Sequence, residues 1–438
     1  METVEKAPDS PPIMDEKPKS AIRILLSKAR VQIPEGEVGP PPDGGFQAWC
    51  QIVAGHFTVC NTWGYITAFG MFQTYYEGFL NESASNISWI GSIQVFLLFF
   101  IGTFSGRAVD AGFFKLTWGT GAILNILGIF MASISKTYWQ LLLSQGVCMG
   151  LGFGLMFSPP LSLLPTYFTT RRSLGVGLAA AGSATGGLIF PAVVQRLLPT
   201  VGYAWTMRVL GFLTLTMLVP SFFLFQQRVP PRRSGPIIEW AAFREKAYVF
   251  FSVGMYLNYW GLYIAFFYIT SFARQIIGLN EKEAIDLLLI LNGVGILART
   301  IPNFIADRRT GPLNLLILST LMSSVMLFCW IAVSDTSGLY AFVVFYGIFS
   351  AGTQSLFPAT LASITDDMKK IGIKLGMVMT ILSFATLTGN PIAGALLTKD
   401  HGGFFYAQLF AAATMMVGTV WITIARFCRT GLVLRAKI

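Results

Sequence analysis

One arginine in the second half of the chain lies in a setting that suits anion binding. Arg299 is most of the way along the apolar stretch DLLLILNGVGILARTIPNFIADRRTG, residues 286–311. A charged side chain at membrane depth costs roughly 2.5–3.5 kcal/mol, so it normally faces a cavity or a partner. Asn292, Gly295 and Arg299 share one helical face. Such a guanidinium suits a bidentate contact with an anionic group; the alternative is a structural arginine bonded to backbone carbonyls.

Two other helical faces combine aromatic rings with a few polar groups. His56, Trp63 and Thr67 share a face in the first apolar segment, and Tyr259 and Tyr263 share one in the seventh. Such faces commonly line a site for a flat or drug-sized solute, although core or lipid packing would use the same residues. Histidine side chains can take up and release a proton, so a co-transported or exchanged proton at His56 stays open beside a packing role. The candidate substrate-binding residues are Arg299, Asn292, His56, Trp63, Thr67, Tyr259, Tyr263 and Gln354.

Charged residues also follow the second apolar segment of each half of the chain. Arg107 and Asp110 end GTFSGRAVD, and Asp307 and Arg308 lie in IADRRTG. Opposite charges beside small residues at a helix end suit a gating contact between two bundles that re-forms in every cycle. The alternative is an ordinary turn anchored by basic residues.

The composition places these residues in a membrane protein. The chain has 438 residues, of which 54% are hydrophobic and only 12% charged, with a mean hydropathy of +0.62. A soluble protein should carry about 25% charged residues. The apolar residues gather in blocks of about 20, which is the length of a membrane-spanning helix.

Twelve such blocks predict an all-α polytopic membrane protein with two six-helix bundles. This arrangement is typical of transporters built from two repeated halves around a midplane site. The predicted spans are 47–71, 88–106, 116–135, 139–160, 174–197, 204–225, 247–270, 285–306, 312–333, 339–361, 373–397 and 404–427. The expected segments are a disordered cytoplasmic tail (1–42), a first bundle (43–225), a basic cytoplasmic loop (226–246), a second bundle (247–428) and a short cytoplasmic tail (429–438).

The distribution of positive charge supports this count. With the N-terminus inside, most of the 31 Lys and Arg residues fall in the tails and the even-numbered loops, as the positive-inside rule requires. Both termini are therefore expected to be cytoplasmic, in a multi-pass protein of the plasma membrane. The first outside loop holds two glycosylation acceptors, Asn81 and Asn86, although Asn86 lies very close to the next span.

The sequence offers no catalytic or metal-binding pattern. The five cysteines fall in or beside apolar segments without a spaced framework, which is typical of small buried residues. No Ser/His/Asp, Cys/His or metal-spaced cluster is present, and the glycine-rich runs lie inside apolar segments where they suit close helix packing. We therefore expect neither an enzyme nor a cofactor.

Several motifs carry a family resemblance, and they are DGGFQAW (43–49), FQTYY (72–76), AAAGS (179–183), FP (190–191), AR (298–299), ADR (306–308) and GNPIAGA (389–395). The chain resembles the major facilitator superfamily, whose loop between spans 2 and 3 carries G-x-x-x-D-R-x-G-R-R. More narrowly, it is similar to the monocarboxylate transporter family in its fungal branch. This resemblance implies twelve helices that alternate between inward-open and outward-open states and carry a small organic solute without ATP.

The chain also departs from that family. Gly295 stands where animal members have an aspartate, and Thr67 aligns with their lysine. That lysine and aspartate serve proton-coupled transport of short carboxylates, so lactate-type symport does not follow from the resemblance. Gly106 stands where the superfamily pattern has an aspartate, with Asp110 displaced.

These observations predict a secondary transporter for an organic anion or an aromatic metabolite. A secondary metabolite exported from a fungal cell is the first candidate for its solute. Uptake of a monocarboxylate-like or vitamin-like nutrient is the alternative, and a non-transporting membrane sensor is a more distant one. The lipid bilayer and the small solute are the expected partners, and nucleic acid is not.

Overall fold

The computed structural model describes residues 41–67, 69–80, 82, 84–229, 238–400, 402–431 and 433, and all its elements within them are helices. Residues 1–40 of the predicted N-terminal tail, the middle of the basic loop, and residues 432 and 434–438 of the C-terminal tail lie outside the described residues. An all-helical chain satisfies its backbone hydrogen bonds within each segment, as a lipid environment requires.

The first half of the chain forms eight helices of nine or more residues and several short turns. They are α2 (Gly45–Val59), η1 (Cys60–Gly64), α3 (Tyr65–Thr67), α4 (Phe69–Leu80), α5 (Ala84–Phe100), α6 (Gly102–Asp110), α7 (Phe114–Ile134), α8 (Tyr138–Leu141), η2 (Leu142–Cys148), α9 (Met149–Leu163), η3 (Leu164–Thr166), α10 (Arg172–Ala180) and α11 (Gly182–Leu224).

The second half is made of long helices joined by short connections. They are η4 (Trp240–Arg244), α12 (Lys246–Gln275), α13 (Glu281–Ile305), η5 (Ala306–Thr310), α14 (Pro312–Trp330), α15 (Thr336–Ile364), η6 (Met368–Lys370), α16 (Ile371–Lys399) and α17 (Phe405–Thr430).

Ten described helices are long and apolar enough to span a membrane. The other two predicted spans arise from interruptions. The helical run from Arg172 to Leu224 contains one non-helical residue, Gly202, with φ of 73° and ψ of 173°, which separates the fifth and sixth spans. The first span runs through α2 to α4 and contains a π-helical turn, η1. The predicted twelve-span plan therefore fits the described helices.

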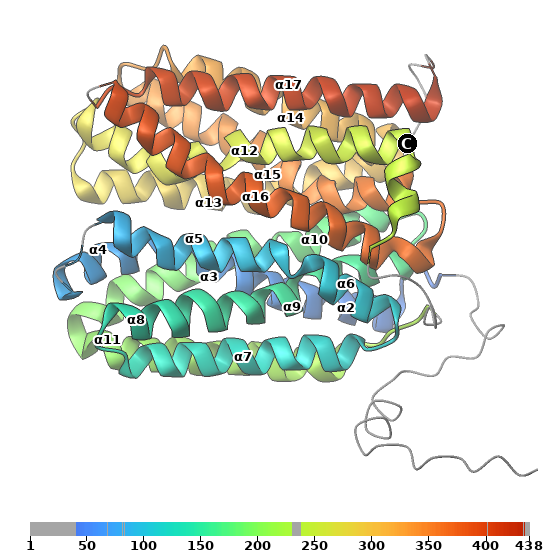
Figure 1. The fold of residues 1–438 in the computed structure, drawn as a ribbon, viewed down its shortest axis with the longest axis horizontal. Helices are drawn as coiled ribbons and strands as arrows, with labels where there is room; N and C mark the ends of the chain where they lie inside the picture. Colours follow the sequence, from blue (N-terminus) through green and yellow to red (C-terminus); the bar gives the residue numbers. More distant parts are fainter. Residues whose placement is uncertain are drawn as a thin grey trace, which may run out of the picture.

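The helices of the two halves lie in two layers (Figure 1). Helices α2–α11 form one layer and α12–α17 form the other, with the helix axes running in roughly the same direction. The described chain begins and ends on the same side of the molecule, which we call the termini side; the opposite side is the far side. An interface between the layers therefore runs from one side to the other.

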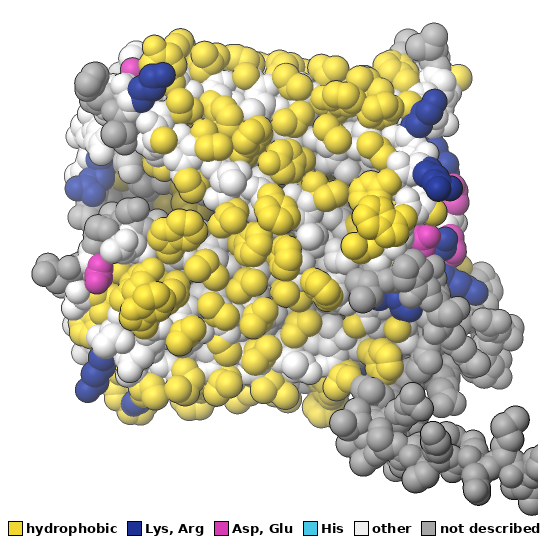
Figure 2. All heavy atoms as spheres, viewed as in Figure 1, with side chains coloured by type: hydrophobic (Ala, Val, Ile, Leu, Met, Phe, Trp, Pro, Cys, Tyr) yellow, Lys and Arg dark blue, Asp and Glu magenta, His cyan; other side chains and the backbone are white. Residues whose placement is uncertain are grey.

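The surface of the molecule matches a membrane location. Figure 2 shows a broad hydrophobic band with Lys, Arg, Asp and Glu gathered at its two ends. Large apolar side chains in this band are well exposed, such as Ile123 at 68%, Phe223 at 70% and Leu297 at 64%. In water this surface would be unfavourable, whereas lipid chains cover it at no such cost.

Glycines allow the two layers to approach closely on the termini side. A Cβ added at Gly106 of α6 would lie 2.1 Å from the carbonyl oxygen of Gly372 in α16, and one at Gly177 of α10 would lie 2.5 Å from the carbonyl oxygen of Arg299 in α13. Small residues permit such backbone contact between membrane helices. Backbones of the two layers thus approach closely where α6 meets α16 and where α10 meets α13.

Candidate functional site

A small cavity surrounds Arg299 where the two layers meet. Its volume is about 30 Å³, close to that of one water molecule. Both halves contribute, from α2, η1, α5, α9, α10 and α11 on one side and α12, α13 and α15 on the other. The lining residues are Val59, Trp63, Phe99, Phe157, Leu161, Ala180, Ser183, Tyr259, Tyr263, Arg299, Gln354, Phe357 and Pro358. We call this the central cavity.

Arg299 is the only charged residue among the described residues lining the central cavity. Its side chain is only 4% exposed, and its Nη2 donates to Oε1 of Gln354 at 3.4 Å. Gly295 makes room for it, since a Cβ there would lie 2.2 Å from Nη1 of Arg299. A buried guanidinium with a single weak neutral acceptor favours an anionic ligand, because burial strengthens its attraction to opposite charge.

Aromatic rings from both halves form the walls of the central cavity. The rings of Trp63 and Tyr263 stack across the interface, with centroids 5.3 Å apart and planes 13° apart. Tyr259 contacts Phe99 at 5.9 Å and Phe357 at 6.0 Å between centroids. Trp63 lies in the π-helical turn η1, and such turns frequently occur at functional sites. The walls therefore suit a planar apolar body beside the arginine.

A second and larger cavity opens between the layers on the far side. Its volume is about 590 Å³, within the range of about 300–1,000 Å³ found for small-molecule sites. We call it the outer cavity. Its lining residues are Thr67, Met71, Gly187, Pro191, Leu198, Thr270, Ser271, Arg274, Gln275, Ala284, Leu288, Leu289 and Asn292.

The predicted substrate residues are thus divided between two places. Arg299, Trp63, Tyr259, Tyr263 and Gln354 lie together in the central cavity. The outer cavity contains Thr67 and Asn292 instead, and Nδ2 of Asn292 donates to the carbonyl oxygen of Leu288 at 3.0 Å. His56 is outside both lining sets, and its Nδ1 lies 2.8 Å from the carbonyl oxygen of Leu178. This backbone contact favours the packing role for His56.

Two aspartates join the layers on the termini side. Asp307 accepts hydrogen bonds from the backbone N–H groups of Ser173 at 2.9 Å and Leu174 at 2.7 Å. Both amides belong to the first turn of α10, whose first four N–H groups have no partner within the helix. A carboxylate is favourable there because of the positive end of the helix dipole. Asp307 therefore caps a helix of the other half.

Asp110 makes the equivalent contact from the first half. It accepts from the backbone N–H groups of Gly372 at 3.1 Å and Ile373 at 2.8 Å, in the first turn of α16. Although Asp110 is displaced from the superfamily pattern, it reaches its helix, and Gly106 occupies the close backbone contact. Of the arginines predicted beside these acids, Arg308 stacks over the ring of Phe304 at 4.2 Å, and Arg107 is half-buried in α6.

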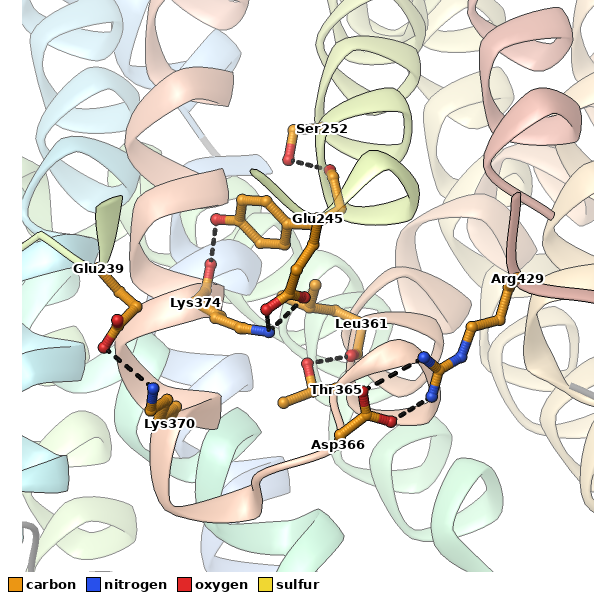
Figure 3. Close-up of polar contacts among 10 residues, drawn as sticks. Glu239, Glu245, Ser252, Leu361, Thr365, Asp366, Lys370, Lys374 and Arg429 are labelled. Carbon is orange, nitrogen blue, oxygen red and sulfur yellow. Dashed lines mark hydrogen bonds and ion pairs between the residues drawn. The ribbon is translucent and has the colours of Figure 1, made fainter. Parts of the chain in front are cut away.

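Further acids hold the same two helix starts from within their own half. Asp43 accepts from the backbone N–H groups of Thr169 at 2.6 Å and Thr170 at 2.9 Å, and from the Thr169 hydroxyl. Partial burial opposes ionisation of Asp43, but these hydrogen bonds outweigh it and lower its pKa to about 2. In the second half, Oε2 of Glu245 lies 2.7 Å from Nζ of Lys374 in α16 (Figure 3).

Two further ion pairs lie in this region, and the pair of Arg429 with Asp366 is the more exposed of the two. Figure 3 shows Lys370 beside Glu239, at 3.5 Å, and Arg429 beside Asp366. The hydrogen bond from Arg429 lowers the pKa of Asp366. Together with Lys374 these groups surround the start of α16.

Several site residues escaped the sequence interpretation. Phe99, Phe157 and Phe357 line the central cavity, but phenylalanines that face lipid have the same local pattern. Asp43 belongs to the DGGFQAW motif, and its position before a predicted span was the available signal. Arg274 was predicted only to lie in an outside loop, and its place in the lining of the outer cavity was missed. Of the glycosylation acceptors, Asn81 lies outside the described residues and Asn86 lies in the first turn of α5, exposed and bonded to Glu82 at 2.9 Å.

Comparisons with known proteins agree with this architecture. The sequence profile of the Major Facilitator Superfamily matches residues 55–330. An MFS-type transporter of Gibberella zeae is 47% identical over 89% of this chain and 89% of its own length. The aspyridones efflux protein of Emericella nidulans is 36% identical over 88% of this chain and 79% of its own length.

Solved transporter structures share the fold. The transporter FucP in its outward conformation aligns with a TM-score of 0.66 at 14% identity, over 86% of this chain and 98% of its own. A bacterial homologue of the iron transporter ferroportin in its outward-facing state aligns with a TM-score of 0.69 at 14% identity, over 87% and 100%. At this identity the likeness concerns the fold alone.

Proposed function

Because the chain belongs to the Major Facilitator Superfamily, and is therefore a secondary transporter for a small molecule, we propose that it exports an organic anion with a planar apolar body. The observation that carries this proposal is the burial of Arg299 among aromatic rings with no carboxylate among the described residues of the central cavity. The exported anion supplies the missing negative charge, and the rings contact its body.

Alternating access follows from the two layers. We assign residues 43–225 and 247–428 to two bundles that rock about the central cavity. The termini side faces the cytoplasm of a cell whose plasma membrane holds the protein, in line with the positive-inside rule. In this orientation the described state is outward-facing, closed by Asp110 and Asp307 and open at the outer cavity. Glycosylation of Asn81 stays a prediction from its sequence motif.

Export of a secondary metabolite is preferred over uptake for two reasons. A relative that this chain resembles over most of its length is an efflux protein for aspyridones. The chain is also similar to the monocarboxylate transporter family, yet Gly295 and Thr67 replace the aspartate and lysine used there for short carboxylates. No Asp, Glu or His is found among the described lining residues of either cavity, so the proposal assigns no proton site to them.

The experiment is an untargeted comparison of metabolites inside and outside cells with and without the protein. We expect one or more acidic metabolites to accumulate inside and fall in the medium when the protein is deleted. Arg299→Ala should reproduce the deletion at normal membrane abundance. Arg208→Ala is the matched control, since Arg208 lies on the same kind of apolar helix but over the ring of Trp205 at 4.9 Å. Normal export by Arg299→Ala would contradict the proposal.

A further inference from the structure

The outer cavity is lined by a positively charged residue, Arg274, that has no role in the proposed export site. Arg274 is the only charged residue among its described lining residues, beside the polar Thr270, Ser271 and Gln275 on the same helix end. Its side chain is exposed and makes no hydrogen bond or ion pair with any other described residue. A solvated guanidinium in a cavity between the halves is available to a solute there.

The two cavities follow one another along three helices. In the first span, Thr67 of the outer cavity lies one turn beyond Trp63 of the central cavity. In α12, Thr270 lies two turns beyond Tyr263, which at 1.5 Å per residue is about 10 Å. In α13, which runs the other way, Asn292 comes two turns before Arg299. The Trp63–Tyr263 stack therefore lies on the boundary between the central and outer cavities.

We propose that the outer cavity is a second, weaker binding site for the exported anion, in which Arg274 contacts the anionic group. This inference rests on the proposed function and adds a release step to it. The central cavity of about 30 Å³ holds no organic solute in this state, whereas the outer cavity of about 590 Å³ does. Once the Trp63–Tyr263 stack has closed behind the solute, the outer cavity is the place it occupies.

The strengths of the two sites differ for a physical reason. Water screens the charge of exposed Arg274, while Arg299 is only 4% exposed and screened far less. Moving from Arg299 to Arg274 thus loosens the anion in steps before it reaches the medium. Without a second positive charge, the anion would leave Arg299 directly for a passage whose other described lining residues are uncharged.

A reporter cysteine in the outer cavity tests this with small probes of opposite charge. Ser271 lines the cavity one turn from Arg274, so their side chains are neighbours. In proteoliposomes of the full chain carrying Ser271→Cys, mass spectrometry follows labelling of that position by an anionic (sulfonatoethyl) and a cationic (trimethylammonioethyl) methanethiosulfonate. We expect the anionic reagent to be favoured relative to its reaction with a free thiol, and Arg274→Gln to lower this preference about three- to tenfold.

Binding of an anion in the outer cavity is then measured as protection of position 271 from labelling. 2-Naphthalenesulfonate should slow labelling at position 271 more than the uncharged 2-naphthalenesulfonamide does, and Arg274→Gln should remove the difference while Arg274→Lys retains most of it. Lys282→Gln is the matched control, because Lys282 is an exposed cation on the same side, at the start of α13, outside the lining set.

Each result decides a separate question. Equal protection by the two naphthalenes, or an effect of Lys282→Gln as large as that of Arg274→Gln, would overturn the second site. Normal export by the Arg299 variant would overturn the proposed function instead, whatever the labelling shows. Loss of export by the Arg299 variant together with Arg274-dependent protection supports both.

Discussion

The two ends of the interface between the halves are built in opposite ways. On the termini side, backbone touches backbone at Gly106 and Gly372, and two carboxylates bind the amides of helix starts in the opposite half. On the far side, the halves enclose a cavity of about 590 Å³. The described state is therefore held together by contacts on the termini side of the interface. Substitutions on that side should shift the equilibrium between the two access states.

The closed end itself has two equivalent parts. The start of α10 is held by Asp43 of its own half and by Asp307 of the other, and the start of α16 is held by Glu245 of its own half and Asp110 of the other. Among these four acids, Asp110 and Asp307 are the two whose contacts must break when the halves separate. The contacts of Asp43 and Glu245 can persist and keep each helix start ready to be capped again.

A steric change at the closed termini side of the interface should disrupt it most strongly. Gly106→Leu places a side chain where even a Cβ would meet the carbonyl oxygen of Gly372 at 2.1 Å, so the termini side should fail to close. The measurement is disulfide formation between Thr103→Cys and Thr380→Cys, whose hydroxyl oxygens lie 2.9 Å apart across the interface. We expect at least a tenfold slower cross-link.

The control for this change is Gly293→Leu, since a Cβ at Gly293 would have no atom within 4 Å. It should leave the cross-linking rate near the unsubstituted value. Rapid cross-linking in Gly106→Leu would show that the glycine contact does not close the interface.

Removing charge from either capping aspartate should have the next largest effect. Asp307→Asn and Asp110→Asn each weaken two charge-assisted hydrogen bonds, at a cost of about 1–3 kcal/mol, which shifts the access equilibrium roughly 5- to 150-fold. The same cross-link reports it, and Asp307 is the cleaner test because it lies away from the reporter helices. Asp335→Asn, at a cap within one half on the far side, should leave the rate unchanged; equal rates in all three variants would contradict the gating role.

Substitution of Asp43 should have a smaller effect, which is measured as a loss of stability toward thermal unfolding. Its pKa of about 2 is below the ordinary value of 3.8, so the stabilisation it contributes is complete above pH 3.8 and is lost only as the pH falls through about 2. Thermal unfolding should therefore show the same destabilisation by Asp43→Asn at every pH from 5 to 8. A loss of the difference within that range would show that Asp43 is not held ionised by Thr169 and Thr170.

The smallest effect should come from the exposed pair of Asp366 and Arg429. Although Arg429 lowers the pKa of Asp366, the Asp366 side chain is 74% exposed, and such surface pairs contribute about 0–1 kcal/mol. Asp366→Asn should leave both the cross-link and the unfolding temperature nearly unchanged. A large shift in either would mean that these outer ion pairs help to hold the closed end.

The sequence predicted the helices better than their contacts. Hydropathy locates the spans because a membrane demands a minimum length of apolar helix, and the expense of burying a charge singled out Arg299. The break at Gly202 was expected only as a gap between spans. The role of Asp43 could not be predicted, because its partners lie more than a hundred residues away and are backbone amides of no distinctive sequence.

The aromatic residues that line the central cavity could be predicted only in part. Trp63, Tyr259 and Tyr263 were predicted from shared helical faces, whereas Phe99 and Phe357 were missed because helix rotation decides whether a phenylalanine faces lipid or the cavity. Composition alone carries no information on that rotation. The family pattern places its aspartate at position 106, four residues before Asp110. In this chain the backbone contact at Gly106 leaves no room for a side chain at that position.

The most direct measurement compares the exported acid with its uncharged amide or ester in binding to the purified protein and to its Arg299→Gln variant. If the buried guanidinium binds the anionic group, the unsubstituted protein should prefer the acid by about 10- to 100-fold, and Arg299→Gln should bind both forms alike. A variant that keeps the full preference for the acid would contradict the account.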